Sequence, residues 1–228
     1  MLAPPAPSAL DVFLPAKRYS MPKSADFWND RFSRDAYVYG VQPNAFVEAA
    51  AGRWLPDAGA VLALGAGEGR NAVFLARQGH DVTALDYSAE GLRKTRRLAE
   101  RSDVSVETIL ADVREWQPDR TWDAIVVTFL HLPPADRADL YALLRRCLRP
   151  GGVLAAEWFR PEQRTEGYTS GGPPDVEMMV TAGELREHFG AEGIEHLEAA
   201  EPMLDEGMHE GPGATVQFVW RRPEDVAE

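Results

Sequence analysis

Residues 61–86 read VLALGAGEGRNAVFLARQGHDVTALD, and this stretch decides the fold that the sequence predicts. Its first four residues form an apolar run with the length and composition of a buried parallel strand. The run breaks into three glycines at alternate positions, Gly65, Gly67 and Gly69. A helical pattern follows as far as Gly79, and a second apolar run ends on Asp86. Strand, glycine loop, helix, strand and acid in this order are typical of the nucleotide-binding half of a doubly wound α/β sheet.

The glycine loop suits an anionic ligand. Glycine tolerates a positive φ and has no Cβ to hold a ligand away from the backbone. The helix that starts after Gly69 presents unpaired N–H groups and a partial positive charge. Asp86 lies 17 residues further on, at the carboxyl end of the next strand, where a carboxylate can accept hydrogen bonds from both hydroxyls of a ribose. The pattern favours a nucleoside-containing ligand, and the alternative is a purely structural glycine turn.

The composition indicates a globular protein with a small-molecule partner. The chain has 228 residues, 45% hydrophobic and 26% charged, which are ordinary globular values. No apolar run approaches the roughly 18 residues that span a bilayer. The single cysteine, Cys147, excludes an intramolecular disulfide and fits a reducing compartment, so we expect a cytoplasmic protein. The net charge of −12 argues against nucleic-acid and membrane partners, which require a basic face.

We expect one folded domain and a flexible extension. Residues 1–20 are rich in proline and alanine and show little periodicity, so they are interpreted as a flexible N-terminal extension. Residues 21–228 are expected to form a single domain, as a monomer or homodimer. Within it we distinguish an N-terminal helical lid over 21–58 and a cofactor-binding core over 59–160. Residues 161–228 supply a lid loop and a C-terminal hairpin.

Five further strands are expected from runs rich in β-branched and apolar residues. They span residues 105–110, 122–129, 153–159, 194–200 and 214–221. The last two are joined without a helix, which predicts that they are antiparallel neighbours. The sequence therefore predicts an α/β fold with a doubly wound, Rossmann-like, mostly parallel seven-stranded sheet and an antiparallel C-terminal hairpin.

Helical patterns precede and separate these strands. They cover residues 26–32, 45–54, 89–101, 135–149 and 181–190. Basic residues of the third helix are expected on a solvated face, namely Arg93, Lys94, Arg96, Arg97 and Arg101. Residues 160–180 and 201–213 lack clear periodicity, and loops of such length in a compact domain are usually lids or binding loops.

The order of these motifs resembles the class I S-adenosylmethionine-dependent methyltransferases. The resemblance covers residues 60–160 best and rests on the glycine loop 64–69, Asp86, Asp112 and the turn 149–152, which reads RPGG. The spacing G-x-G-x-G is tighter than the G-x-G-x-x-G of dinucleotide sites. It is similar to sites where the methionine carboxylate of S-adenosylmethionine takes the place of a pyrophosphate.

A narrower similarity points to the tellurite-resistance and thiopurine methyltransferase-like branch. It rests on the segment 67–71, GEGRN, and on the lead-in with Phe27-Trp28, Tyr39-Gly40 and Pro43-Asn44. The tellurite branch has a C-terminal Glu-x-x-His followed by arginines. The segment 206–209, EGMH, fits that motif in outline, but the arginines are missing.

The resemblance implies S-adenosylmethionine as the cofactor. The implied cofactor site consists of Trp28, Tyr39, Gly65, Gly67, Gly69, Arg70, Asn71, Asp86, Tyr87, Asp112, Val113 and Phe129. In this assignment the glycines hold the methionine end, Asp86 holds the ribose with Tyr87 beside it, and Asp112 accepts from the adenine amino group. A turn acid is the alternative for Asp112. The family usually has an acid two residues before the first glycine, whereas this chain has Ala63.

Methyl transfer is an in-line displacement at a sulfonium carbon, so the protein mostly positions and desolvates the reactants. A general base is needed only if the acceptor must lose a proton first. The first candidate is His131, because the segment after the fourth strand faces the methyl group in this fold. Tyr168 and His209 are further candidates, and for His131 the alternative is a packing role beside Pro133. The sparse histidine pattern and single cysteine predict no metal site.

The lid segments are expected above the carboxyl ends of the strands. Residues 28–44 hold Trp28, Tyr37 and Tyr39, which either pack on the sheet or belong to a lid. With the loops 160–180 and 201–213 they are expected to bring four side chains into one cavity. These side chains are Tyr39, His131, Tyr168 and His209.

The predicted function is methyl transfer from S-adenosylmethionine to a small-molecule acceptor. Two other classes remain open. One is an NAD-type oxidoreductase on a related sheet, and the other is a catalytically silent nucleoside-binding module.

Overall fold

The computed structural model describes residues 23–224; the expected extension over residues 1–20 lies outside the described residues. The sheet contains β1 (Ala60–Leu64), β2 (Asp81–Asp86), β3 (Glu107–Leu110), β4 (Trp122–Thr128), β5 (Leu148–Phe159), β6 (Ile194–Ala200) and β9 (Thr215–Arg221). A separate hairpin consists of β7 (Met203–Glu206) and β8 (His209–Pro212). The helices are α1 (Ala25–Phe32), α2 (Ala45–Ala51), α3 (Arg70–Arg77), α4 (Ala89–Arg101), α5 (Pro134–Cys147), α6 (Glu162–Thr165), the 3-10 helix η1 (Val176–Met178) and α7 (Ala182–Phe189).

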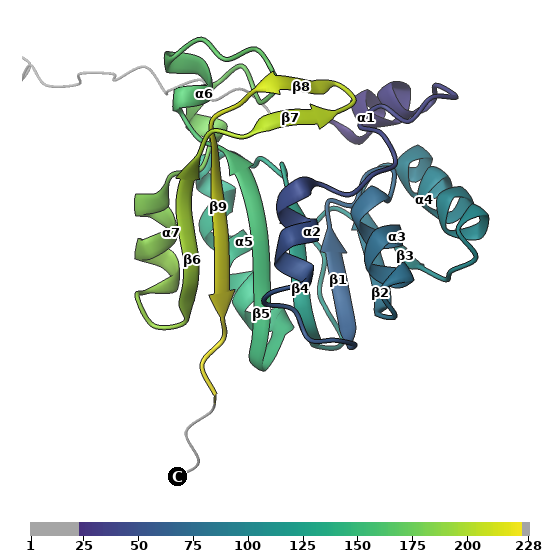
Figure 1. The fold of residues 1–228 in the computed structure, drawn as a ribbon, viewed down its shortest axis with the longest axis horizontal. Coiled ribbons are helices and arrows are strands. Elements are labelled where there is room, and N and C mark those ends of the chain that lie inside the picture. The colour runs from purple at the N-terminus through teal and green to yellow at the C-terminus, as the bar shows by residue number, and fades with distance from the viewer. Residues whose placement is uncertain (1–22, 225–228) are drawn as a thin grey trace, which may run out of the picture.

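The strand order confirms the predicted α/β fold (Figure 1). The seven strands follow the order β3-β2-β1-β4-β5-β9-β6. Strands β1 to β5 pair in parallel, and β9 is antiparallel to both of its neighbours, β5 and β6. The order reverses between β1 and β4, and open α/β sheets bind ligands beyond the carboxyl ends of their strands at such a switch point.

Helices cover both faces of the sheet, which explains why its strands are continuous apolar runs. Leu62 and Leu64 of β1 belong to a cluster that includes residues of α5 and α7. Val61 and Ala63 point the other way, into a cluster with residues of α2, α3 and α4. The side chains of β9 alternate in the same way, because Phe218 belongs to the first cluster and Val219 to the second.

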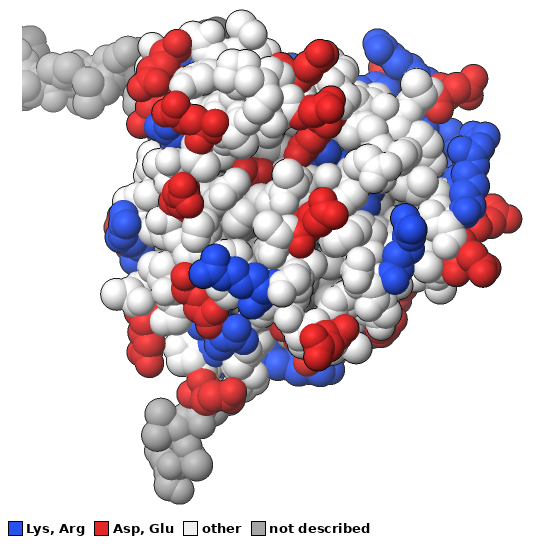
Figure 2. Space-filling view, viewed as in Figure 1, with Lys and Arg blue, Asp and Glu red and all other residues white. Residues whose placement is uncertain are grey.

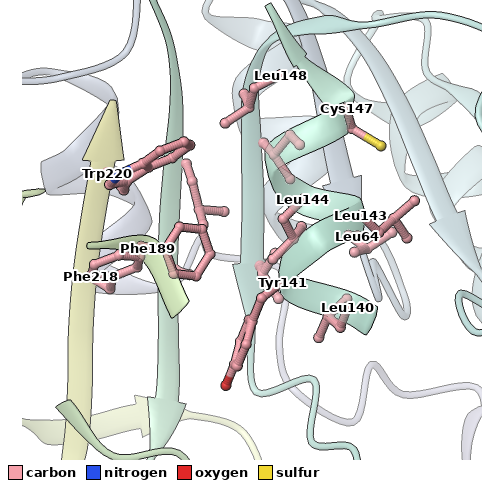
Figure 3. Packing of buried hydrophobic residues seen from close by; sticks show 14 of the residues in the cluster. Leu64, Leu140, Tyr141, Leu143, Leu144, Cys147, Leu148, Phe189, Phe218 and Trp220 are labelled. Carbon is pink, nitrogen blue, oxygen red and sulfur yellow. The ribbon is translucent and has the colours of Figure 1, made fainter. Parts of the chain in front are cut away.

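In the first cluster, side chains of α7 and β9 pack against α5 (Figure 3). The ring centroid of Phe189, in α7, lies 5.6 Å from that of Tyr141, 5.0 Å from Phe218 and 5.2 Å from Trp220. Cys147, the last residue of α5, is 1% exposed. Burial raises the pKa of its thiol to about 11, so this cysteine acts as a small apolar core residue.

The elements end as the local sequence predicts in most places. Ser88 caps α4 by accepting from the backbone N–H of Gly91, and Asn44 caps α2 in the same way. Thr181 caps α7 through the N–H of Glu184. The Glu184 carboxylate, however, contacts Arg137 at 2.6 Å instead of completing a capping box.

Three segments differ from the prediction. Strand β5 begins at Leu148 rather than Val153. The expected loop 160–180 contains α6 and η1, and the expected loop 201–213 forms the hairpin β7–β8. The hairpin strands have four residues each and expose every second side chain of β7. Because such short strands bury few apolar residues, their hydrophobic pattern is too weak to predict.

The surface carries charges of both signs. In the view of Figure 2, acidic and basic side chains are interspersed, and no continuous basic surface forms on this face. Among residues 23–224, none of the helices combines the length and apolar character needed to cross a bilayer.

Candidate functional site

A cavity of about 590 Å³ lies at the carboxyl ends of the parallel strands. Figure 1 shows α1, α6 and the hairpin β7–β8 above this edge of the sheet. The predicted site residues that line the cavity are Trp28, Tyr39, Gly65, Gly67, Arg70, Asn71, Asp86, Tyr87, Asp112, Val113, Phe129, His131 and His209. Segments from the lead-in, the 160–180 region and the hairpin all contribute to its wall, as the sequence predicted.

The glycine loop has the backbone conformation that requires glycine. Gly65 and Gly67 have φ values of 65° and 55° and face the cavity. Gly69, with φ 88°, does not line it. A Cβ on Gly69 would lie 2.6 Å from the side chain of Thr95, in α4. We therefore correct the expected ligand contact of Gly69: its role is to let α3 begin close to α4.

Asp86 is fixed at the end of β2 by two backbone amides. One carboxylate oxygen accepts from the N–H of Gly67 and the other from that of Ser88, each at 2.8 Å. Burial, at 7% exposure, raises the pKa of Asp86. The acid and the glycine loop therefore hold each other in place at the cavity wall.

A buried ion pair attaches the lead-in to the glycine loop. The Lys94 Nζ atom lies 2.6 Å from Glu68 Oε1 and donates to the carbonyl of Ala36 at 2.7 Å. The other Glu68 oxygen accepts from the N–H groups of Val38 and Tyr39. Lys94 is 1% exposed, so its expected place on a solvated face is wrong. The Lys94 ammonium group contacts the Glu68 carboxylate instead of the water that we expected around a charged side chain.

The aromatic residues of the lead-in form a cluster above the glycine loop. The ring of Phe32 lies 5.3 Å from Trp28 and 6.4 Å from Tyr39, measured between centroids. A Cβ on Gly67 would approach Phe32 to 3.5 Å. Of the two interpretations left open for this segment, the structure therefore favours a lid over the loop.

The hairpin β7–β8 is held by buried polar contacts. Glu206 pairs with Arg70 at 2.6 Å and also accepts from Asn44 Nδ2 at 2.9 Å. The same amide donates to Glu157, which Thr215 also contacts. Burial raises the pKa of Glu157, and the nearby Glu206 carboxylate adds to this shift. The network joins the lead-in, α3, β5 and the hairpin behind the cavity.

Asn71 strengthens the same junction. Its side-chain oxygen accepts from the N–H of Asn44 at 2.9 Å, and its Nδ2 donates to Thr128 at 3.0 Å. Asn71 thus connects the start of α3 to the end of β4, while also lining the cavity.

His209 enters the cavity within a ring of aromatic residues. Its centroid lies 4.6 Å from Tyr39, 4.7 Å from Phe129 and 5.2 Å from Phe159. The Nδ1 atom is buried without a hydrogen-bond partner among the described residues. Burial, followed by the charge of Arg70, lowers the pKa of His209 to about 3. The ring is therefore neutral at physiological pH, and it is a weak base that can accept a hydrogen bond but does not readily take up a proton.

His131 lines the cavity, but both of its nitrogens are engaged. Nδ1 lies 3.0 Å from the carbonyl of Met178, and Nε2 accepts from the N–H of Phe159 at 3.4 Å. These partners fix the tautomer, because a carbonyl only accepts and an amide N–H only donates. Burial lowers the pKa of His131 to about 4. We therefore correct its expected role: it connects η1 to β5 rather than offering a free nitrogen to an acceptor.

Tyr168 does not join the other candidates. It is absent from the cavity wall, and its hydroxyl is hydrogen-bonded to Glu201. The next residue, Thr169, reaches the cavity instead. The sequence therefore located the correct loop but the wrong residue within it.

The expected adenine end has a compact charged pair. Asp112 contacts Arg114 at 2.5 Å, and this hydrogen bond lowers the pKa of the Asp112 carboxyl. Tyr87 donates to the carbonyl of Lys23 at 2.5 Å, and burial raises its pKa to about 12. Val113 completes this end of the wall.

A family model described as a methyltransferase domain matches residues 61–152, the segment from β1 to β5 that carries the glycine loop, Asp86 and Asp112. Residues 61–152 are a methyltransferase domain of the class I, S-adenosylmethionine-dependent type.

Two curated methyltransferases share part of the sequence. Trans-aconitate 2-methyltransferase from Azoarcus sp. (strain BH72) is 37% identical over 108 residues, 46% of this chain and 41% of that protein. The probable S-adenosyl-L-methionine-dependent methyltransferase TehB of Haemophilus influenzae (strain ATCC 51907 / DSM 11121 / KW20 / Rd) is 31% identical over 72 residues, 32% of this chain and 25% of TehB. The matches thus span less than half the length of either relative.

Solved structures share the fold over a longer range. One comes from work on the conversion of a disulfide bond into a thioacetal group during echinomycin biosynthesis. It has a TM-score of 0.69 and 21% identity, over 89% of this chain and 91% of that one. TehB from Haemophilus influenzae has a TM-score of 0.63 and 19% identity, over 87% of this chain and 66% of that one. At these identities the likeness shows the fold alone.

The methyltransferase cavity fits S-adenosylmethionine. At Gly65 and Gly67 the backbone itself forms the wall, and a side chain there would be strained by the positive φ. The Asp86 carboxylate stands at the end of the neighbouring strand, where a ribose needs an acceptor. When bound, this cofactor supplies an electrophilic methyl group on sulfur.

Several residues of the site escaped sequence reasoning. The buried partners Glu68 and Lys94, and the hairpin acid Glu206, each depend on a contact with a residue far away in the sequence. Only Glu206 had a local signal, the Glu-x-x-His spacing that ends at His209. Arg31 and Arg114, which line the cavity, had none.

Proposed function

We propose that this methyltransferase transfers the methyl group of S-adenosylmethionine to a small-molecule acceptor bound in the same cavity. The observation that carries the proposal is that one cavity contains both the glycine loop with Asp86 and a separate wall of aromatic and methionine side chains. That second wall is formed by Tyr39, Phe129, Phe159, Met178, Met208 and His209. A volume of about 590 Å³ accommodates a cofactor together with a small molecule.

In this proposal the chain binds the cofactor and the acceptor, orients them toward each other and removes water from around them. The loop 65–67 and Asp86 hold the cofactor, while the rings around His209 exclude water from the acceptor. His209 contributes a neutral ring to this wall and accepts a hydrogen bond from an acceptor that carries a donor. His131 and Tyr168 have no such role, given their engaged nitrogens and outward position respectively.

Calorimetry with S-adenosylhomocysteine tests the cofactor assignment. We expect micromolar binding, about 8 kcal/mol, and a loss of at least about tenfold in Asp86→Ala, since the ribose loses its acceptor. Asp81→Ala, at the exposed start of the same strand, is the matched control and is expected to bind as the original chain does. Equal affinity of Asp86→Ala and Asp81→Ala would refute the ribose contact.

The two alternative functions give different results. An oxidoreductase would bind NAD more tightly than S-adenosylhomocysteine, and the missing third glycine of G-x-G-x-x-G argues against that outcome. A silent binding module would bind the cofactor without turning it over. Transfer of labelled methyl groups to a panel of small acceptors, chosen from molecules that co-purify with the protein, distinguishes it from an enzyme.

The role of His209 is tested on the same reaction. His209→Gln is expected to lower turnover at least about tenfold while leaving S-adenosylhomocysteine affinity within about twofold. His188→Gln serves as the control, because His188 lies in α7 and packs on Tyr141. A fall in cofactor affinity equal to the fall in turnover would mean that His209 belongs to the cofactor site.

A further inference from the structure

The charged side chains around the cavity are paired with a counter-charge, with the exception of Asp86, Lys23 and Arg31. Glu68 pairs with Lys94, Arg70 with Glu206 and Asp112 with Arg114. Asp86 is satisfied by backbone N–H groups. Within residues 23–224, no carboxylate lies within ion-pair distance of the remaining two, Lys23 and Arg31. These two cations outnumber the single carboxylate of Asp86, so the uncompensated charge of the cavity is positive, although the chain carries a net charge of −12.

These two cations stand on the same aromatic ring. The Lys23 Nζ atom lies 4.6 Å and the Arg31 guanidinium 4.8 Å from the centroid of Phe27. The guanidinium also lies 5.3 Å from the ring of Trp28. Both aromatic residues line the cavity. Cation–π contacts orient the charges but do not neutralise them, so both cations remain available to an anion.

Arg31 has donors to spare. Its Nη1 atom donates to the hydroxyl of Tyr39 at 3.1 Å. Among contacts with the described residues this uses one of five N–H donors, and the planar fork matches a carboxylate in a bidentate pair. The ring of Tyr39 is in turn 4.6 Å from His209. An anion on Arg31 is thus connected through one side chain to the aromatic wall of the cavity.

We propose that Arg31, together with Lys23 on the same Phe27 ring, is a carboxylate-binding site at the rim of the cavity. The inference rests on the proposed function, because it concerns a ligand of the same cavity. Two bound molecules can supply the carboxylate: the acceptor, and the methionine end of the cofactor. We assign it to the acceptor, since the first N–H groups of α3, which no side chain caps, are available to the methionine carboxylate.

The test uses Arg31→Met. This change keeps an apolar side chain against the rings of Phe27 and Trp28 but removes the positive charge and the N–H donors. Arg34→Met, an exposed arginine that does not line the cavity, is the matched control. Circular dichroism verifies folding of both. Binding of S-adenosylhomocysteine and of 5′-methylthioadenosine, which lacks the carboxylate, is measured by calorimetry. We expect Arg31→Met to bind both ligands as the original chain does.

A second arm examines the acceptor side. Benzoate, succinate and citrate are added to protein saturated with S-adenosylhomocysteine, with benzamide and succinamide as uncharged counterparts. We expect at least one carboxylate, and neither amide, to raise the melting temperature of the original chain and of Arg34→Met. That shift is expected to disappear in Arg31→Met.

The outcomes separate the possibilities. If Arg31→Met loses affinity for S-adenosylhomocysteine but not for 5′-methylthioadenosine, Arg31 binds the carboxylate of the cofactor and not that of the acceptor. Arg31→Met matching the original chain in both arms overturns the site and leaves the proposed function intact. Failure of the original chain to bind S-adenosylhomocysteine overturns the proposed function, and this inference with it.

Discussion

Arg70 and Glu206 are joined by a buried contact of 2.6 Å, although 136 positions separate them in the sequence. Arg70 is the first residue of α3, directly after the glycine loop, and Glu206 ends the first strand of the hairpin that covers the cavity. The loop expected to hold the cofactor and the hairpin beside the aromatic wall are therefore connected by one ion pair.

Removing the charge of Glu206 tests this connection. In Glu206→Gln the buried Arg70 loses its counter-charge, and breaking a buried pair typically costs about 3–5 kcal/mol. We expect the free energy of unfolding, measured by urea denaturation, to fall by about 3 kcal/mol, and amide hydrogen exchange in residues 203–212 to accelerate. Asp205→Asn, on an exposed neighbour, is expected to change neither quantity. Unchanged exchange in Glu206→Gln would show that other contacts hold the hairpin.

Gly67 tests the backbone wall of the cavity. Valine at this position is strained by the positive φ of 55°, and its side chain takes space beside Phe32. We expect Gly67→Val to bind S-adenosylhomocysteine at least about tenfold more weakly while retaining its circular dichroism spectrum. Gly52→Val, at a helix end with φ −76° and no atom within 4 Å of its Cβ position, is the control. Normal binding by Gly67→Val would place the ligand elsewhere.

The Glu68–Lys94 pair is expected to be a stability determinant. Lys94→Met keeps an apolar stem of similar size but leaves the Glu68 carboxylate buried without its partner. We expect a loss of about 3 kcal/mol in the free energy of unfolding. Arg93→Met removes an exposed i,i+3 pair with Glu90, and no measurable loss of stability is expected because solvent screens such a pair. Equal losses in the two variants would contradict the buried pair.

Acid is expected to destabilise the protein through its buried histidines. The pKa of His131 is lowered to about 4 and that of His209 to about 3, from an ordinary value of 6.5. Between pH 6.5 and about 4 the unfolded chain binds these protons and the folded chain does not, so stability falls as the pH falls, by up to about 1.4 kcal/mol per pH unit for each histidine.

His209→Gln isolates one of the two contributions. Urea midpoints measured at several pH values should decline less steeply in this variant than in the original chain. Buried carboxylates with raised pKa values, Asp86 and Glu157, act in the opposite direction, but they are present in both proteins. Parallel pH dependences would mean that His209 is accessible to protons in the folded state.

The sequence predicted the parts of the fold that depend on local signals. The glycine loop and the strand ending on Asp86 follow from backbone requirements and apolar runs, and both were located correctly. The helix caps seen at Asn44 and Ser88 are equally local, because each side chain accepts from an N–H three positions away. Such features need no information on distant contacts.

The remaining features depend on partners that adjoin only after folding. Lys94 looks like any solvated lysine until Glu68 is placed beside it. The hairpin 203–212 is anchored by buried polar groups such as Glu206, and polar burial leaves no periodic apolar pattern. His131 has the chemistry of a base, but the carbonyl of Met178, 47 positions away, occupies one of its nitrogens.

Cys147 gives the protein a practical property. It is the single cysteine of the chain, and its buried thiol, with a pKa raised to about 11, offers almost no thiolate to alkylating reagents at neutral pH. Glu210→Cys would introduce an exposed thiol on the hairpin without any need to remove the native one. A fluorophore or spin label attached there would report on the hairpin in an otherwise unaltered chain, so any response of the hairpin to a bound ligand can be followed directly.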